Sequence, residues 1–187
     1  MRYILVLCCL LLSTVPAFSR DIAGVQLAET LQGADGTQLT LNGAGVRSKV
    51  FLKIYVAGLY LQNPAKEAAA VLADQGQKQM LMHFLYEEVS KDKLVSAWNE
   101  GFTGNLTKEQ HDALAPRIEQ FNALFDTVKK GDVIVIEYLP GKGTAVTVKG
   151  EAKGVIEGKD FSDAVFSIWL GEKPVTESLK KELLGYK

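Results

Sequence analysis

Cysteine and histidine are nearly missing from this 187-residue chain, and their scarcity narrows the chemistry that it can perform. The only cysteines are Cys8 and Cys9, and the only histidines are His83 and His111. Metal sites and nucleophile–base pairs need several such side chains close together. His83 lies in an apolar stretch, where we expect a structural histidine. We therefore predict no metal site, and no motif in the chain calls for a cofactor.

Long hydrophobic runs are also lacking, except for one at the N-terminus. Residues 4–12 are almost wholly apolar, follow the basic Arg2 and precede small residues at 17–19. This is the pattern of a secretory signal peptide, and the run is shorter than the roughly 20 residues that span a bilayer. We expect residues 1–19 to be a cleaved leader and residues 20–187 to form one domain. The protein is then expected to be periplasmic or secreted, without disulfide bonds and without a stable membrane anchor.

Neither charge is in excess. The chain carries 21 lysine and arginine residues against 22 aspartate and glutamate residues, a net charge of −1, and the two signs are interspersed. A nucleic-acid binder usually shows a basic patch or stripe. This balance argues against nucleic acid as a partner.

Strand and helix patterns fill the rest of the chain. β-branched and aromatic runs bounded by glycine or aspartate predict strands at 25–31, 38–41, 46–61, 79–89, 133–139, 144–149 and 154–157. Capping signals predict helices over 65–73, from Ser90 through Trp98, after Thr107, over 161–170 and after Thr176.

The order of these elements predicts the fold class. The last three strands are joined by short connections containing glycine, which predict antiparallel hairpins. Pro116 should kink or split the third helix. Because strands and helices do not alternate as in βαβ units, we predict an α+β domain, with helices packed on one face of a large antiparallel sheet.

The segment 42–62 contains the most informative residue, Arg47. A predicted turn from Gly43 to Gly45 precedes it, and a long apolar strand follows. A guanidinium stays charged at ordinary pH, so it must reach water or be paired. The turn resembles half of a dinucleotide-binding fingerprint, but it leads into a strand and lacks the third glycine. We therefore predict no nucleotide site.

Three tyrosines lie in the apolar strands, and each hydroxyl needs a partner if it is buried. Tyr55, Tyr60 and Tyr86 each fit core packing with a backbone hydrogen bond. Alternatively, one or two of them converge with Arg47 on the carboxylate or carbonyl of a ligand. An arginine fork with phenolic donors binds such oxygens in a dry pocket.

These residues resemble the chalcone isomerase family. The plant enzymes carry Gly-Ala-Gly-Val-Arg, which is found here at residues 43–47, followed by a strand that ends in a pattern similar to residues 58–61. Tyr86, with Trp98 twelve residues later, is similar to the tyrosine-to-tryptophan spacing in the enzymes. Residues 162–171 resemble a helix near the enzymes' C-terminus.

The resemblance implies an open-faced β-sandwich, with a ligand cleft between the sheet and a layer of helices. The enzymes close an unsaturated ketone into a flavanone ring, and their arginine stabilises the developing negative charge while a tyrosine helps to polarise the ketone. Arg47 and Tyr86 match these two residues. They are the catalytic candidates, and the ligand would then be flavonoid-like.

Three positions and one loop depart from the enzymes' pattern. Tyr55 stands at the position of a threonine and Lys93 at that of an asparagine. Ile168, beside Trp169, stands where the enzymes keep a serine or threonine, and the loop after Arg47 is shorter. A tyrosine in place of that threonine is similar to the fatty-acid-binding members of the family, in which an arginine and a tyrosine hold the lipid carboxylate.

The leading hypothesis is an exported, non-enzymatic binder of a small lipophilic carboxylic acid, similar to the family's bacterial members. Arg47 would pair with the carboxylate, Tyr55 would donate to it, and Tyr86 would be a third donor. The predicted ligand site is completed by Lys93, Ile168 and Trp169. The apolar tail is expected against residues such as Met82, Phe84, Leu94 and Trp98.

Two alternatives stay open at this point. The first is an isomerase that uses Arg47 and Tyr86. The second is a structural or interaction module in which Arg47 forms an internal salt bridge with a carboxylate such as Glu87 or Glu137.

Overall fold

The computed structural model describes residues 19–186 of the chain. Residues 1–18 of the expected leader lie outside this part, so the leader stays a prediction. No helix within residues 19–186 is long and apolar enough to cross a membrane.

Seven strands form one curled antiparallel sheet, as predicted. In spatial order the strands are β11 (Glu151–Ile156), β10 (Gly143–Val148), β9 (Val133–Leu139), β6 (Lys78–Phe84), β5 (Leu52–Leu61), β4 (Gln38–Lys49) and β3 (Thr30–Gln32). The predicted hairpins β9–β10 and β10–β11 are confirmed. Two further antiparallel pairs are β1 (Ser19–Ile22) with β2 (Val25–Ala28), and β7 (Glu88–Val89) with β8 (Val128–Lys129).

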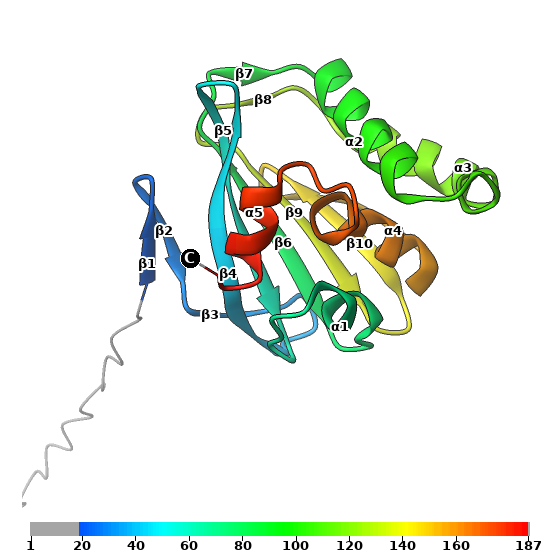
Figure 1. The fold of residues 1–187 in the computed structure, drawn as a ribbon, viewed down its shortest axis with the longest axis horizontal. Coiled ribbons are helices and arrows are strands. Elements are labelled where there is room, and N and C mark those ends of the chain that lie inside the picture. The colour runs from blue at the N-terminus through cyan, green and yellow to red at the C-terminus, as the bar shows by residue number, and fades with distance from the viewer. Residues whose placement is uncertain (1–18, 187) are drawn as a thin grey trace, which may run out of the picture.

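The described part of the chain also contains five helices, so the α+β class is confirmed. They are α1 (Ala68–Ala73), α2 (Lys91–Asn105), α3 (Lys108–Ala123), α4 (Lys159–Leu170) and α5 (Glu177–Leu183). Figure 1 shows the helices on one side of the sheet and the β1–β2 hairpin on the other. The predicted caps of α2 and α3 are confirmed: Ser90 accepts from the Lys93 N–H, and Thr107 forms a capping box with Gln110.

The sheet packs on both of its faces around β5. The helix side carries the larger cluster, to which β5 contributes Tyr55, Ala57, Leu59 and Leu61. The other side packs against the β1–β2 hairpin, and there β5 contributes Val56 and Tyr60. The Tyr60 hydroxyl donates to the Ala28 carbonyl at 3.0 Å, so this tyrosine has the structural role that core packing predicts.

A β-bulge at Asn42 determines which face of the sheet receives Arg47. Leu41 pairs with Tyr60, whereas Gly43 pairs with Leu59, so Asn42 is an extra residue in β4. An extra residue reverses the alternation of side chains between the two faces. Upstream of the bulge, Leu41 packs under the β1–β2 hairpin. Downstream, Gly43, Gly45 and Arg47 pair with residues whose side chains face the helices.

The bulge is anchored by side-chain hydrogen bonds. Asn42 Nδ2 donates to the Leu183 carbonyl at 2.9 Å, and Asn42 Oδ1 accepts from the Ala65 N–H at 2.9 Å. These bonds link β4 to the end of α5 and to the loop before α1.

The turn predicted at Gly43 to Gly45 is wrong, because these residues lie in the middle of β4. A Cβ atom at Gly43 would collide with the main chain of Glu182 and Leu183 in α5. One at Gly45 would collide with the Glu182 side chain. The glycines therefore allow α5 to approach the sheet closely.

The predicted strand 46–61 is two strands joined by a tight turn at Val50 and Phe51. Lys49 pairs with Leu52 across the turn, and Val50 has a positive φ of 58°. A second irregularity follows Arg47: Ser48 pairs with Lys53, which leaves Ile54 as the extra residue of β5. Sequence reasoning missed this turn because none of its residues is a usual turn former.

Other element boundaries differ from the prediction. The strand expected at 25–31 is β2 and β3, and the one expected at 79–89 ends at Phe84. The first helix begins after Glu67, since the Asn63 side chain bonds to Asp74 instead of capping it. The predicted split of α3 at Pro116 is wrong. Pro116 is exposed, and the buried Leu114, Ile118 and Phe121 hold α3 against the core as one helix.

Candidate functional site

A cavity of about 460 Å³ lies between the sheet, α2 and the connection from α4 to α5. This volume falls within the range of about 300–1,000 Å³ that is typical of small-molecule sites. The sheet side is lined by residues from the β4–β5 hairpin and from the end of β6, namely Arg47, Lys49, Val50, Leu52, Ile54, Tyr55, Phe84 and Tyr86. The rest of the wall comes from β7, from α2 and from α4 with the connection that follows it, namely Glu88, Val89, Lys93, Leu94, Ser96, Ala97, Trp98, Glu100, Ile168 and Val175.

Arg47 is one of three cationic residues that line this cavity, with Lys49 and Lys93, and it is the only one of the three that is half-buried rather than exposed in the described chain. Its backbone pairs directly with Tyr55, and its guanidinium carbon lies 5.7 Å from the centroid of the Tyr55 ring. Arg47 Nε is buried and has no hydrogen-bond partner in the part of the chain that the structure describes. A buried N–H without an acceptor is costly, so this atom is a strong candidate for contact with an oxygen of a ligand.

The internal salt bridge considered for Arg47 is not formed with either expected carboxylate. Glu87 instead lies 3.7 Å from Lys130 Nζ, on the exposed surface. Glu137 accepts from Gln77 Nε2 at 2.6 Å, and it is on β9, away from the cavity. That prediction is wrong, because both carboxylates already have other partners.

Tyr55 is positioned to donate a hydrogen bond. Its side chain is only 4% exposed, and its oxygen accepts from Trp169 Nε1 at 3.0 Å. Burial raises the pKa of Tyr55, and the charge of Arg47 and the Trp169 hydrogen bond oppose this effect only in part. The phenol therefore stays neutral. Because Trp169 has no acceptor atom, the phenolic proton of Tyr55 is left to donate elsewhere.

Trp169 contributes to the site indirectly, by donating a hydrogen bond to Tyr55. It is fully buried and does not line the cavity, so the predicted direct contact with a ligand is replaced by its hydrogen bond to Tyr55. Its ring lies 5.7 Å from that of Trp98, which does line the cavity. Among residues 19–186 the buried Trp98 Nε1 has no hydrogen-bond partner, which adds a second N–H donor to this region.

The other predicted site residues form the cavity walls. Tyr86 and Lys93 lie on opposite sides of it, on the chain after β6 and on α2. Ile168 supplies an apolar wall on α4, where the enzymes keep a hydroxyl. Of the residues expected to contact an apolar tail, Phe84, Leu94 and Trp98 line the cavity and Met82 does not.

Sequence reasoning missed Val50 and Leu52, the lining residues next to the hairpin turn, and Ala97, a lining residue on α2. Ala97 follows Leu94 by three residues, and this spacing on a helix was a usable signal. Val50 and Leu52 gave no such signal, because they were assigned to a continuous strand.

Within residues 19–186, no group of three or more histidine, cysteine, aspartate or glutamate side chains lies close enough together to hold an ion. Glu88 and Glu100 also line the cavity, whereas Arg47 and Tyr55 place hydrogen-bond donors beside apolar side chains such as Phe84 and Leu94. This part of the cavity suits an anionic oxygen at one end of an apolar molecule.

The fold and cavity define a class of protein: a curled antiparallel sheet covered by helices, with an arginine beside an apolar cavity between the two layers. The family model described as chalcone isomerase-like matches residues 19–185. The chain therefore belongs to the chalcone isomerase-like family. A search of curated proteins finds no match.

A solved structure with the same fold is the crystal structure of a fatty-acid-binding protein from Arabidopsis thaliana. The TM-score is 0.62 at 14% sequence identity, and the alignment covers 83% of this chain and 96% of the plant protein's chain. At this identity the similarity establishes the fold.

Proposed function

We propose that this protein is a non-enzymatic binder of a small lipophilic carboxylic acid, such as a fatty acid. The observation that carries the proposal is the buried Arg47 Nε, which has no hydrogen-bond partner within residues 19–186. The guanidinium carbon of Arg47 lies 5.7 Å from the centroid of the Tyr55 ring, and both residues line the same largely apolar cavity. A carboxylate placed there would accept from the guanidinium and from the phenol at once.

The cavity accounts for both ends of such a ligand. The backbones of Arg47 and Tyr55 are fixed by strand pairing, and the Tyr55 hydroxyl is held by Trp169, so the freedom lost when the carboxylate binds is limited. Away from them, Phe84, Leu94 and Ile168 offer apolar surface for the tail. The structural neighbour from Arabidopsis, a fatty-acid-binding protein, supports this choice of ligand. Export to the periplasm or the exterior is part of the proposal and rests on the predicted leader.

The experiment compares an acid with its ester. Delipidated protein is titrated with palmitate and with methyl palmitate by isothermal calorimetry, for the wild type and for Arg47→Met. Removing one partner of a buried charge pair typically costs at least about 2 kcal/mol, so palmitate affinity should fall by about 30-fold or more. The ester, which carries no charge, should be affected much less.

Arg20→Met is the matched control. Arg20 is paired with Glu29 at 3.0 Å, at the β1–β2 hairpin and outside the 460 Å³ cavity, so its loss should leave palmitate affinity unchanged. Equal affinity of the wild type for acid and ester would show that the head-group assignment is wrong. Absence of palmitate binding at micromolar concentration would reject the function itself.

An isomerase is the second candidate, because Tyr86 lines the same cavity as Arg47. The two could polarise a ketone and stabilise an enolate-like transition state. Ile168 offers no hydroxyl where the enzymes keep one, which favours binding over catalysis. A chalcone cyclisation rate that is unchanged by the protein, or equal in the wild type and Arg47→Met, would remove this candidate.

A further inference from the structure

The tip of the β4–β5 hairpin exposes three consecutive apolar side chains. Val50 is 83% exposed, Phe51 96% and Leu52 52%. Within residues 19–186, the other large apolar side chains that are exposed are Val155, on β11, and Tyr186, after α5. Single exposed apolar residues are common on protein surfaces, whereas adjacent ones often form part of a contact surface.

Two lysines flank these side chains. Lys49 precedes them and Lys53 follows them, and both are exposed. Neither forms an ion pair with any residue in the described part of the chain. The neighbouring acidic residues Glu87 and Glu88 are paired with Lys130 and Lys129, at 3.7 and 3.8 Å. The hairpin tip therefore presents an apolar centre between two free positive charges.

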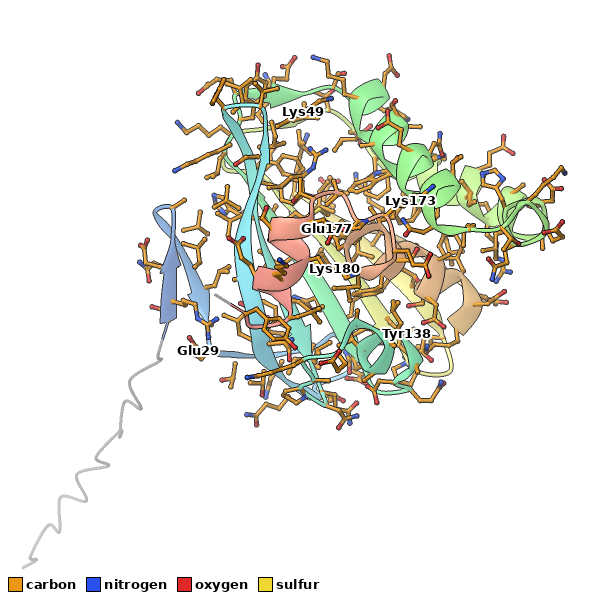
Figure 2. The ribbon with its side chains drawn as sticks, viewed as in Figure 1. Glu29, Lys49, Tyr138, Lys173, Glu177 and Lys180 are labelled. Carbon is orange, nitrogen blue, oxygen red and sulfur yellow. The ribbon has the colours of Figure 1, made fainter. Side chains whose placement is uncertain are left out.

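The hairpin tip also forms part of the solvent-exposed rim of the cavity. Lys49, Val50 and Leu52 line the cavity together with Arg47, which lies two residues before Lys49 on the same strand. Figure 2 shows Lys49 near the tip of the hairpin, at the end of the molecule away from Glu29 and Tyr138. A ligand that enters beside the hairpin tip reaches Arg47 directly.

We propose that the hairpin tip, residues 49–53, docks on the surface of an anionic lipid bilayer and that the cavity exchanges its ligand there. Phe51 and its apolar neighbours would enter the boundary between head groups and acyl chains, and the two lysines would contact anionic head groups. The two lysines beside the apolar side chains, unpaired within residues 19–186, favour an anionic bilayer as the partner. A stable protein interface usually involves about 20–30 residues on each side, many more than this five-residue tip offers. The exchange step rests on the proposed function, whereas the docking step does not.

The first measurement is co-sedimentation with vesicles of phosphatidylcholine alone and of phosphatidylcholine mixed with phosphatidylglycerol. We expect the wild type to bind the mixed vesicles more strongly. Phe51→Ser should lower the partition coefficient by about tenfold and Lys53→Gln by about fivefold. Matched controls are Val155→Ser on β11 and Lys142→Gln in the β9–β10 turn, which should bind as the wild type does.

The second measurement separates docking from ligand binding. Neither Phe51 nor Lys53 lines the cavity, so palmitate affinity in solution should be the same in both variants and in the wild type. The rate of palmitate transfer from mixed vesicles should rise with vesicle concentration in the wild type and should fall in Phe51→Ser.

Each failure has a distinct meaning. Normal palmitate affinity without vesicle binding would overturn the docking proposal and leave the proposed function intact. Vesicle binding through Phe51 without palmitate affinity would overturn the proposed function and leave the docking proposal intact. Equal vesicle binding by wild type and Phe51→Ser, or self-association through Phe51 without vesicles in analytical ultracentrifugation, would also overturn docking.

Discussion

A double-mutant cycle on Tyr55 and Trp169 tests the arrangement that holds the proposed head-group site. The two residues are 114 positions apart, and the hydrogen bond between them joins β5 to α4 through the buried centre of the protein. The variants are Tyr55→Phe, Trp169→Phe and the combination of both.

The magnitudes follow from what each variant leaves unpaired. Tyr55→Phe leaves the indole N–H of Trp169 buried without an acceptor, which costs about 1–3 kcal/mol of unfolding free energy. Trp169→Phe loses the same bond and also removes part of a fully buried side chain, so it should cost more. In the double variant no polar atom of the pair is left unsatisfied. We therefore expect the double variant to be more stable than the sum of the single losses implies, with a coupling free energy of at least about 1 kcal/mol.

The assay is urea unfolding followed by circular dichroism, with unchanged m-values as the check that all variants unfold alike. Single losses that add to within about 0.5 kcal/mol would refute the reasoning. A binding measurement adds a second criterion: Tyr55→Phe should weaken palmitate binding more than Trp169→Phe does, because only the first removes the phenolic donor.

Two further predictions concern stability. Gly43→Ala would push a methyl group into the main chain of α5, so it should lower the unfolding free energy by about 1–3 kcal/mol. In Gly104→Ala on α2 the new methyl group meets nothing closer than 3.6 Å, so this variant should raise the unfolding free energy by up to about 1 kcal/mol. Equal effects of the two variants in urea unfolding would contradict the close packing of α5. Burial lowers the pKa of Lys78 to about 8 in the folded protein, whereas the ordinary lysine pKa of 10.5 applies in the unfolded chain. Between these values the unfolded state binds more protons than the folded state. The unfolding free energy should therefore rise by at most about 1.5 kcal/mol from pH 8 to 9.5. Lys78→Met should abolish this rise, and a rise of the same size in that variant would assign it to other groups.

Local signals predicted much of the fold. The caps at Ser90 and Thr107 and the two C-terminal hairpins depend on residues close together in the sequence, and the structure confirms them. The features that the sequence did not predict depend on distant contacts. The glycines of β4 are explained only by α5, more than a hundred residues later, and the hydrogen bond between Tyr55 and Trp169 has no local signature.

The candidate site shows the same division. Arg47, Tyr55, Tyr86, Lys93 and Ile168 were selected from the sequence, and the structure brings all of them to one cavity. The role of Trp169 was mistaken, because adjacent residues on a helix face different directions and only the packing shows which one reaches the cavity. The apolar hairpin tip was missed because Val50 and Phe51 are strand formers that here make a turn.

Asn42 sets the face of the sheet to which every later side chain of β4 points. Removing this one residue would exchange the two faces of β4 from Gly43 onward, so that Arg47 would turn toward the β1–β2 hairpin while Ala44 and Val46 would turn toward the helices. The same five-residue motif could then have opposite meanings in two chains that differ by a single insertion. In this chain, therefore, the motif at residues 43–47 places Arg47 at the cavity only because the bulge residue Asn42 precedes it.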